Sequence, residues 1–392
     1  MLQRQLSVFA VALLLASCAS VLPSFVSGTP CKTTAFTVTD NFAAARRGRC
    51  VAVADDHVRI TILPEDEGYI NDSPWFAMKV VPNHASTATI TIDYRGGHHR
   101  YRPKTSTDGL RWAALDDSAV TVKADRSSAT LTLPLGDEPV WLAAQEVITP
   151  VFYDIWNRKM AKTGFVEQFV LGASRKGLPI HVLTTTPDTD DVLFLVGRQH
   201  PPEVTGALGF LAFFEALVAD TELANRFRQQ VTVVAVPLLN PDGVTGGNWR
   251  NNLGGTDLNR DWVKFEQPET GLIKELLDKL DANGKRIRVF LDFHSTQKNV
   301  FYTQNDAFPT EPPRFTKTWL ENARPRVRNY EFVNQENPVA NEGVAKNYMY
   351  KRYGIPSLTY EVGDETDRTA IREAAGVFAE ELMLLMLEQN YE

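Results

Sequence analysis

Hydrophobic and polar residues alternate along the first third of the chain with the period of β-strands. The segments 57–62, 88–94 and 129–133 each alternate with a period of two, and this alternation predicts half-buried strands. Glycine, proline, asparagine and aspartate separate these segments, as they do in the turns of antiparallel sheets. The pattern predicts an antiparallel β-sandwich domain over residues 56–149.

After Pro150 the pattern changes to apolar strands that alternate with helices. Strands are predicted over residues 191–197, 231–238, 288–293 and 358–362. Helices are predicted over residues 202–219, 268–281, 342–353 and 367–389. This alternation is typical of an α/β domain, so residues 150–392 are expected to form a mixed, largely parallel sheet that is flanked by helices.

The first 17 residues have the pattern of an export signal peptide. Arg4 supplies a short positive region, residues 6–16 form an apolar stretch, and small residues follow. The apolar stretch is too short to span a bilayer as a mature helix. Residues 15–18 (Leu-Ala-Ser-Cys) resemble the lipobox of bacterial lipoproteins, in which the signal is cut before the cysteine and the cysteine then carries the lipid.

Two locations follow from this N-terminus. With lipid on Cys18, the protein is expected to be a membrane-anchored lipoprotein of a bacterial cell envelope. The alternative is an ordinary signal peptide, cut within the same dozen residues or near Gly28, which gives a periplasmic or secreted protein. In either case residues 18–55 are expected to form an N-terminal segment before the sandwich.

The cysteine count fits an exported protein. Once Cys18 is lipidated or removed, Cys31 and Cys50 remain, and an even pair in an exported protein favours a disulfide. A bridge that closes a loop of about 20 residues would stabilise the fold by roughly 3 kcal/mol. The alternative is a pair of buried free thiols.

Composition and charge exclude several classes of protein. Hydrophobic residues make up 43% and charged residues 23% of the 392 residues, which excludes a wholly disordered chain, a collagen and a coiled coil. Lysine and arginine number 41 and aspartate and glutamate 48, so the net charge is −7. Such a charge disfavours a large phosphate-binding surface, and no nucleic-acid partner is expected.

Three predicted strands of the α/β domain end in residues that could bind a metal or transfer a proton. His200 and Glu203 follow the first of them, His294 follows the strand 288–293, and Glu361 follows Tyr360 near the end of the strand 358–362. Open α/β sheets place ligands beyond the carboxyl ends of their strands. Two histidines and one carboxylate are a ligand set for catalytic zinc. The alternative for Glu203 is a carboxylate that stabilises a helix start.

A glycine-rich loop over residues 246–262 carries Arg250 and Arg260. Such a loop can bring two guanidinium groups to an anion. The alternative is a solvated connection, although long loops inside compact domains are usually functional.

Together these pieces resemble the zinc carboxypeptidases, the family of carboxypeptidase A. They look most like its cytosolic carboxypeptidase branch, which has a β-sandwich before the catalytic domain. The matching segments are 199–203, 248–250, 257–260, 292–295 and 360–364, and residues 71–76 resemble the start of the sandwich in that branch. The resemblance implies that residues 150–392 are a zinc metallocarboxypeptidase catalytic domain.

The resemblance implies a metal site. His200, Glu203 and His294 would bind one zinc ion per chain. Asp257 would accept a hydrogen bond from the other ring nitrogen of His200 and so fix its tautomer. Zinc can lower the pKa of a bound water to about 7, so a nearby carboxylate can complete its deprotonation.

The resemblance also implies a substrate site for the C-terminus of a peptide or protein. Asn259 and Arg260 would hold the terminal carboxylate, and Arg250 would polarise the scissile carbonyl and stabilise its oxyanion. Glu361 would be the general base for the water and would then pass the proton to the leaving amine.

Lys346 is the expected specificity residue. In the family, the residue at this spacing before the catalytic glutamate lies at the base of the pocket for the C-terminal side chain. A lysine there implies a preference for glutamate or aspartate, because a buried ammonium needs a paired anion. A one-residue slip would bring Ala345 or Asn347 into the pocket instead, and the alternative for Lys346 is a solvated position on the helix 342–353.

One departure from the family concerns a mobile tyrosine, which residues 338–342 do not contain. Tyr302, Tyr330 and Tyr348 are the candidates to replace it.

Two other functions fit part of the sequence. One is a zinc amide hydrolase of related fold that deacylates amino acids, and the other is an exported, non-catalytic binding protein. The pair Asn259 and Arg260 favours a carboxy-terminal substrate over the first function. The intact ligand set and Glu361 argue against the second.

Overall fold

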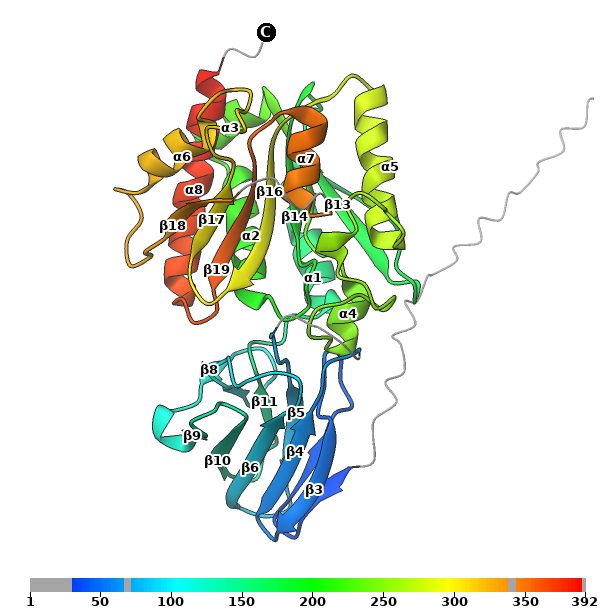
Figure 1. Cartoon of the computed structure of the whole chain (residues 1–392), viewed down its shortest axis with the longest axis vertical. Coiled ribbons are helices and arrows are strands. Elements are labelled where there is room, and N and C mark those ends of the chain that lie inside the picture. The colour runs from blue at the N-terminus through cyan, green and yellow to red at the C-terminus, as the bar shows by residue number, and fades with distance from the viewer. Residues whose placement is uncertain (1–29, 67–71, 338–342, 390–392) are drawn as a thin grey trace, which may run out of the picture.

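The computed structural model describes residues 30–66, 72–337 and 343–389. Within these residues the chain has two parts, a β-sandwich and an α/β domain, stacked end to end (Figure 1). Helix α1 (Pro150–Ala161) begins the second part. The expected signal peptide and Cys18 lie outside the described residues.

The sandwich consists of two sheets. The six-stranded sheet contains, in spatial order, β1 (Cys31–Lys32), β2 (Phe36–Thr39), β5 (Ala77–Pro82), β11 (Val140–Ala143), β7 (Lys104–Ser106) and β8 (Ala113–Ala114). The five-stranded sheet contains β3 (Arg49–Ala54), β4 (His57–Ile62), β6 (Ser86–Tyr94), β10 (Ser128–Leu135) and β9 (Val120–Val122). The three alternating segments of the sequence are therefore confirmed as β4, β6 and β10. Pairing is antiparallel apart from β4 with β6.

The sandwich begins earlier than residue 56. Strands β1, β2 and β3 pair within its two sheets, so residues 31–54 belong to the sandwich and are no separate N-terminal segment. The sequence pattern does not reveal them because β1 and β2 are short. Strand β3 lies at a sheet edge, where most of its residues are exposed on both faces.

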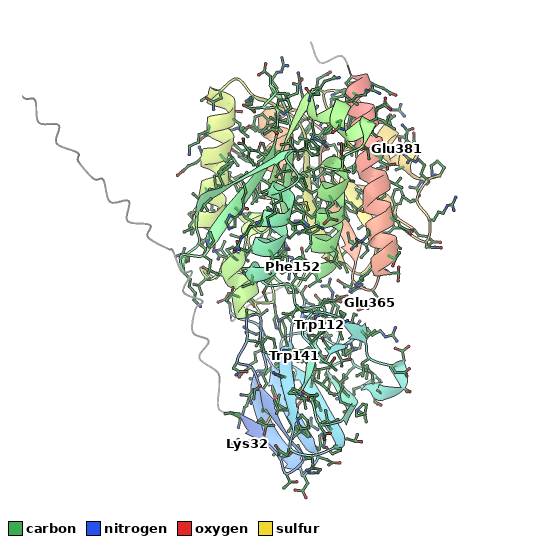
Figure 2. The ribbon with its side chains drawn as sticks, turned by 180° about the vertical axis from the view of Figure 1, so that it is seen from behind. Lys32, Trp112, Trp141, Phe152, Glu365 and Glu381 are labelled. Carbon is green, nitrogen blue, oxygen red and sulfur yellow. A yellow bond between two sulfur atoms is a disulfide. The ribbon has the colours of Figure 1, made fainter. Side chains whose placement is uncertain are left out.

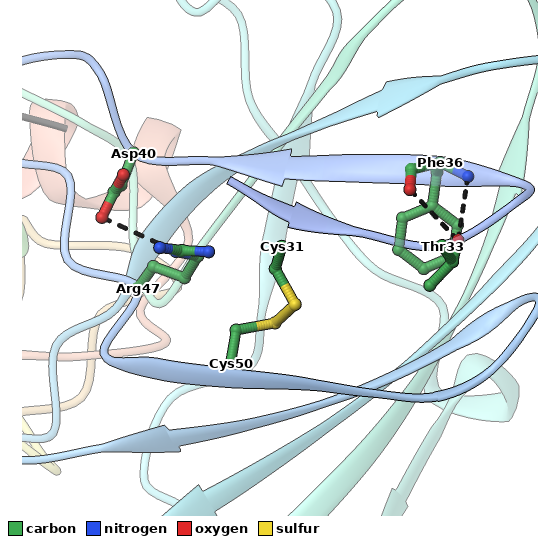
Figure 3. Close-up of a disulfide and its surroundings, with 6 residues drawn as sticks. All are labelled: Cys31, Thr33, Phe36, Asp40, Arg47 and Cys50. Carbon is green, nitrogen blue, oxygen red and sulfur yellow. Dashed lines mark hydrogen bonds and ion pairs between the residues drawn. A yellow bond between two sulfur atoms is a disulfide. The ribbon is translucent and has the colours of Figure 1, made fainter. Parts of the chain in front are cut away.

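A disulfide joins the two sheets of the sandwich. Cys31 on β1 and Cys50 on β3 form an S–S bond of 2.07 Å (Figure 3). Each strand is the outer strand of its sheet, so the bridge closes one side of the sandwich. The ion pair of Arg47 Nε with Asp40 Oδ2, at 3.6 Å, lies in the same region.

The α/β domain is built on one eight-stranded sheet. In spatial order its strands are β12 (Val166–Ala173), β13 (Pro179–Thr185), β15 (Val231–Val236), β14 (Asp191–Gly197), β16 (Arg286–Thr296), β19 (Ser357–Gly363), β17 (Val300–Thr303) and β18 (Val333–Glu336). The central strands β15, β14, β16 and β19 are parallel to one another. Outside them β12 with β13, β13 with β15 and β17 with β19 pair antiparallel, and β17 with β18 pairs parallel. The expected mixed, largely parallel sheet is confirmed.

Helices cover both faces of this sheet (Figure 1). Besides α1, they are α2 (Val204–Leu217), α3 (Glu222–Arg228), α4 (Pro241–Gly246), α5 (Pro268–Ala282), α6 (Phe315–Ala323), α7 (Ala345–Tyr353) and α8 (Arg368–Glu388). Short 3-10 turns are η1 (Asp117–Ala119) and η2 (Leu258–Arg260). Helices α2 and α8 share one apolar core with the sandwich, whereas α5 and α7 pack on a second core across the sheet.

No single helix in the described part of the chain is long and apolar enough to cross a membrane. Helices α2 and α3 reach the required length and hydropathy only as a pair, and they are bent by 89° relative to each other.

Several polar contacts fix the two domains to each other. Arg100 of the sandwich forms an ion pair with Asp364, just after β19, with 2.8 Å between Nε and Oδ2. Lys104 Nζ lies 2.8 Å from Oε2 of Glu365, which lies with Trp112 at the junction of the domains (Figure 2). Both side chains of the first pair are only 7% exposed. These contacts hold the sandwich against the segment that follows β19.

Candidate active site

The ends of neighbouring strands bring three candidate metal ligands together. His200 and Glu203 lie in the turn between β14 and α2, and His294 lies near the end of β16. Nδ1 of His200 is 2.8 Å from Glu203 Oε1, and Nδ1 of His294 is 2.7 Å from Glu203 Oε2. The two Nδ1 atoms are 3.1 Å apart. All three side chains are buried and point to one place.

A carboxylate holds the other nitrogen of each imidazole. Nε2 of His200 is 2.9 Å from Asp257 Oδ1, and Nε2 of His294 is 2.7 Å from Asp292 Oδ2. An ionised carboxylate only accepts hydrogen bonds, so it holds the ring proton on Nε2 and leaves the lone pair of Nδ1 directed at the shared point. Two imidazole nitrogens and one carboxylate are a zinc ligand set that leaves a further position open. The residues fit a zinc ion.

Glu203 is ionised, as a metal ligand must be. Before a metal binds, burial raises the pKa of its carboxyl, but attraction to the protonated imidazoles of His200 and His294 and hydrogen bonds from them outweigh burial and hold that pKa well below its ordinary range.

Close packing of α2 against β16 keeps these ligands together. Gly206 lies in the first turn of α2, where a Cβ would come within 2.2 Å of the His294 carbonyl oxygen. The Gly206 N–H donates to Oγ of Ser295 at 2.7 Å, and the Thr205 hydroxyl also donates to it, at 2.9 Å. A residue with a side chain at position 206 would push the helix away from the strand, and Glu203 would move away from His294.

Asp257 connects the metal site to Arg250. Its Oδ1 accepts from His200, and its Oδ2 accepts from Nε of Arg250 at 2.8 Å. Nη1 of Arg250 then lies 3.8 Å from Oε1 of Glu203. The guanidinium group is therefore held at the edge of the candidate metal site.

Asn259 and Arg260 follow in the same loop and line the same cleft. Nδ2 of Asn259 is 3.2 Å from Nε2 of His294, and its Oδ1 accepts from the Ala345 N–H at 2.8 Å. The Arg260 side chain is 48% exposed, and its Nη1 donates to the Asn259 carbonyl at 2.6 Å. Arg260 is therefore the cation of this loop that is open to a ligand.

Glu361 lies beside the metal ligands. It is paired across the sheet with His294, and its Oε2 is buried without a hydrogen-bond partner in the described structure. Burial raises the pKa of Glu361 to about 7. A carboxyl group with a pKa near neutral can both take and release a proton, which suits a general base.

Lys346 lies on the first turn of α7 and lines the cleft, whereas its neighbours Ala345 and Asn347 do not. Its side chain is buried, so it is no solvated helix residue. Nζ donates to Asn347 Oδ1 at 2.9 Å and lies 3.5 Å from the Asn337 carbonyl. Burial lowers the pKa of Lys346 to about 8.

Of the three tyrosines considered, only Tyr302 lines the cleft. The Tyr330 hydroxyl is buried against that of Tyr360, 3.2 Å away. Tyr348 packs on the ring of Trp262, with 6.1 Å between ring centroids. Residues 338–342 lie outside the described structure.

Asp292 and Gln199 have roles that the motifs alone did not reveal. Asp292 is fully buried and receives two hydrogen bonds, of 2.9 and 2.8 Å, from Nε2 of Gln199. The Trp262 indole N–H donates in turn to Gln199 Oε1 at 2.9 Å. The contact of Asp292 with His294 could have been inferred from their spacing, because residues two apart on a strand lie on the same face.

Comparison with known proteins identifies the family. Residues 154–381 match the model of the zinc carboxypeptidases, which covers more than half of the chain. The chain therefore belongs to the zinc carboxypeptidase family.

Two curated relatives are cytosolic carboxypeptidases. Cytosolic carboxypeptidase 6 of Caenorhabditis elegans is 28% identical over 258 residues, which are 62% of this chain and 53% of the relative. Cytosolic carboxypeptidase 1 of Danio rerio is 35% identical over 141 residues, 32% of this chain and 12% of the relative. The chain thus spans about half, or much less, of the length of these relatives.

Solved structures share the fold of both domains. A metallo-carboxypeptidase from Burkholderia cenocepacia has a TM-score of 0.75 at 19% identity and covers 90% of this chain and 98% of its own. A metallo-carboxypeptidase from Pseudomonas aeruginosa, in complex with (2-guanidinoethylmercapto)succinic acid, has a TM-score of 0.75 at 21% identity, with 90% and 99% covered. The sandwich and the α/β domain therefore occur together in other proteins of this fold.

The contact of Asp292 with His294 leads to a first prediction. Asp292→Asn replaces an acceptor of the imidazole N–H by an amide, so we expect zinc affinity to fall roughly 10- to 100-fold. Competition with a chromophoric chelator measures this affinity. Asp191→Asn is the matched control, because Asp191 lies at the opposite end of the same sheet and pairs with Arg286. Equal zinc affinity of Asp292→Asn and wild type would contradict the assigned role.

Proposed function

We propose that the protein is a zinc-dependent metallocarboxypeptidase that hydrolyses the C-terminal peptide bond of peptides or proteins, with one zinc ion per chain. The observation that carries this proposal is the convergence of His200, Glu203 and His294 beside Glu361, whose Oε2 has no hydrogen-bond partner within the described residues. When bound, zinc supplies a Lewis acid that activates water and polarises a carbonyl.

The chain's own residues divide the remaining work. Arg260 and Asn259 bind the terminal carboxylate and so set which peptide bond reaches the metal site. Arg250, fixed by Asp257, donates to the carbonyl oxygen as negative charge develops on it, and such donors contribute about 3–4 kcal/mol. Glu361 takes a proton from the attacking water and delivers it to the leaving amine.

We further propose a preference for acidic C-terminal residues. The cleft has three cationic side chains, Arg250, Arg260 and Lys346, and the first of them is already paired with Asp257. Lys346 is buried, and its hydrogen bonds within the described structure go to neutral oxygen atoms. A side-chain carboxylate of the substrate would supply the anion that a buried ammonium group needs.

The proposed chemistry predicts different effects for a metal ligand and for the base. His294→Ala should lose both zinc and activity. Glu361→Gln should keep zinc but lower kcat by roughly 100- to 10,000-fold, because the amide cannot accept the proton. Metal analysis and cleavage of a peptide pool, followed by mass spectrometry, measure both quantities.

Two controls make this test specific. His181→Ala changes a histidine on β13, which is not among the cleft residues, and should keep both zinc and activity. Peptides with an amidated C-terminus should remain intact, because they lack the carboxylate for Arg260. Robust turnover by Glu361→Gln would remove the assigned base, and cleavage of amidated peptides would favour a general amide hydrolase.

The acidic preference predicts a selectivity change at Lys346. Wild type should favour peptides that end in Glu over those that end in Leu or Lys by roughly 10- to 100-fold in kcat/KM, the value of a hydrogen bond to a charged group. Lys346→Ala should lose this preference, whereas Lys351→Ala, on the same helix, should keep it. The preference should weaken as the pH rises above about 8, because Lys346 then loses its proton. An equal preference in wild type and Lys346→Ala would contradict the proposal.

We also propose that the protein is exported and anchored to a bacterial membrane through lipid on Cys18. Stable anchoring needs more than one acyl chain, and bacterial lipoproteins carry several on this cysteine. Cys18→Ser should leave the protein unprocessed or release it from the membrane fraction. Ser20→Ala, just beyond the motif, should behave as wild type. Equal processing and equal membrane partitioning of Cys18→Ser and wild type would count against lipidation.

A further inference from the structure

The loop that carries Arg250 is held by the sandwich. Glu65, which follows β4, accepts hydrogen bonds from three consecutive backbone N–H groups of this loop. Its Oε2 accepts from Trp249 at 2.6 Å, and its Oε1 accepts from Arg250 at 2.9 Å and from Asn251 at 2.6 Å. Successive N–H groups that surround one anion form a strong, directional site.

Further contacts connect the same loop to the sandwich. The Trp249 indole N–H donates to the Trp75 carbonyl at 3.0 Å, and the Trp249 side chain is fully buried. Asp66, next to Glu65, accepts from Nδ2 of Asn251 at 2.8 Å. The backbone of the loop on both sides of Arg250 is thus fixed by residues of the other domain.

These contacts decide where the Arg250 guanidinium lies. Its backbone is fixed by Glu65, and its Nε is fixed by Asp257, which also holds His200. One polar chain therefore runs from the sandwich to the metal ligands. Arg250 is part of this chain of contacts, and it is restrained both at its backbone N–H and at its guanidinium group.

We propose that Glu65 is a positioning residue for Arg250, so that the sandwich completes the active site. This inference rests on the proposed function, in which Arg250 stabilises the developing oxyanion. Without Glu65, three N–H groups lose their acceptor, and the loop relaxes toward other partners. A shift of the guanidinium by about 1 Å is enough to cost up to roughly 100-fold in rate.

The test uses the full-length protein and four variants: Glu65→Gln, Arg250→Ala, their double mutant and the control Glu365→Gln. In Glu65→Gln an amide NH₂ replaces one carboxylate oxygen and opposes at least one of the loop's N–H groups. The control removes another carboxylate at the domain junction, which accepts from the Arg102 N–H and from Lys104 instead of from the loop. Zinc content and melting temperature are measured for every variant.

Glu65→Gln should lower kcat roughly 10- to 100-fold, with KM and zinc content close to wild type. In the Arg250→Ala background the same change should have little further effect, because residues that act together are not additive. The control should keep wild-type kcat. A kcat of wild-type size in Glu65→Gln, or an equal loss in both backgrounds, would overturn the inference.

The proposed role of Arg250 is tested separately in the same series. Full activity of Arg250→Ala would overturn that role, whereas a loss there with full activity in Glu65→Gln would overturn only the inference about Glu65. If Glu65→Gln does not fold, Asp66→Asn replaces it. We then expect a loss of roughly tenfold in kcat, absent from the Arg250→Ala background, and an unchanged kcat would overturn the inference.

Discussion

The candidate site depends on one carboxylate, that of Asp257. Burial raises its pKa, but His200, Arg250 and Arg260 outweigh burial and keep it ionised. It accepts from the candidate metal ligand His200, from Arg250, and from the Asn259 N–H at 2.9 Å. The Asp257 side chain is only 19% exposed, and a carboxylate in such a place needs partners of this kind. The same contacts also fix His200, Arg250 and the start of the turn that carries Asn259 and Arg260.

Much of this arrangement could be predicted from the sequence, because it follows from strand order. Parallel strands end at one edge of a sheet, so His200, His294 and Glu361 had to lie close together once β14, β16 and β19 were neighbours. The strand 191–197 was predicted at its observed bounds, and the four predicted helices lie within a few residues of α2, α5, α7 and α8, whereas α1, α3, α4 and α6 were not predicted. Short local patterns were sufficient to predict the place of a residue wherever that place depends only on its position along a strand.

The parts that the sequence did not reveal depend on contacts between distant segments. Glu65 lies 184 residues before Trp249, and no periodicity relates a sandwich loop to a loop of the other domain. The start of the sandwich was misplaced because β3 is an edge strand, which lacks the buried face that produces alternation. Asp292 is a different case. Its spacing of two residues from His294 is visible in the sequence, but this spacing indicates a contact only when it is known to which side of the sheet the strand directs both side chains.

The charged groups of the cleft explain why it is surrounded by so many polar contacts. A charge that is buried in this cleft, such as that of Glu203 or Lys346, needs a partner at short distance. Asp257 pairs with Nε of Arg250, and Glu65 accepts hydrogen bonds from backbone N–H groups of the same loop, whereas the Arg260 side chain is 48% exposed and open to a ligand. Ordering this long loop costs about 1–2 kcal/mol of backbone entropy for each residue that is fixed. The sandwich offsets part of that cost in this chain, because it binds backbone N–H groups of the loop.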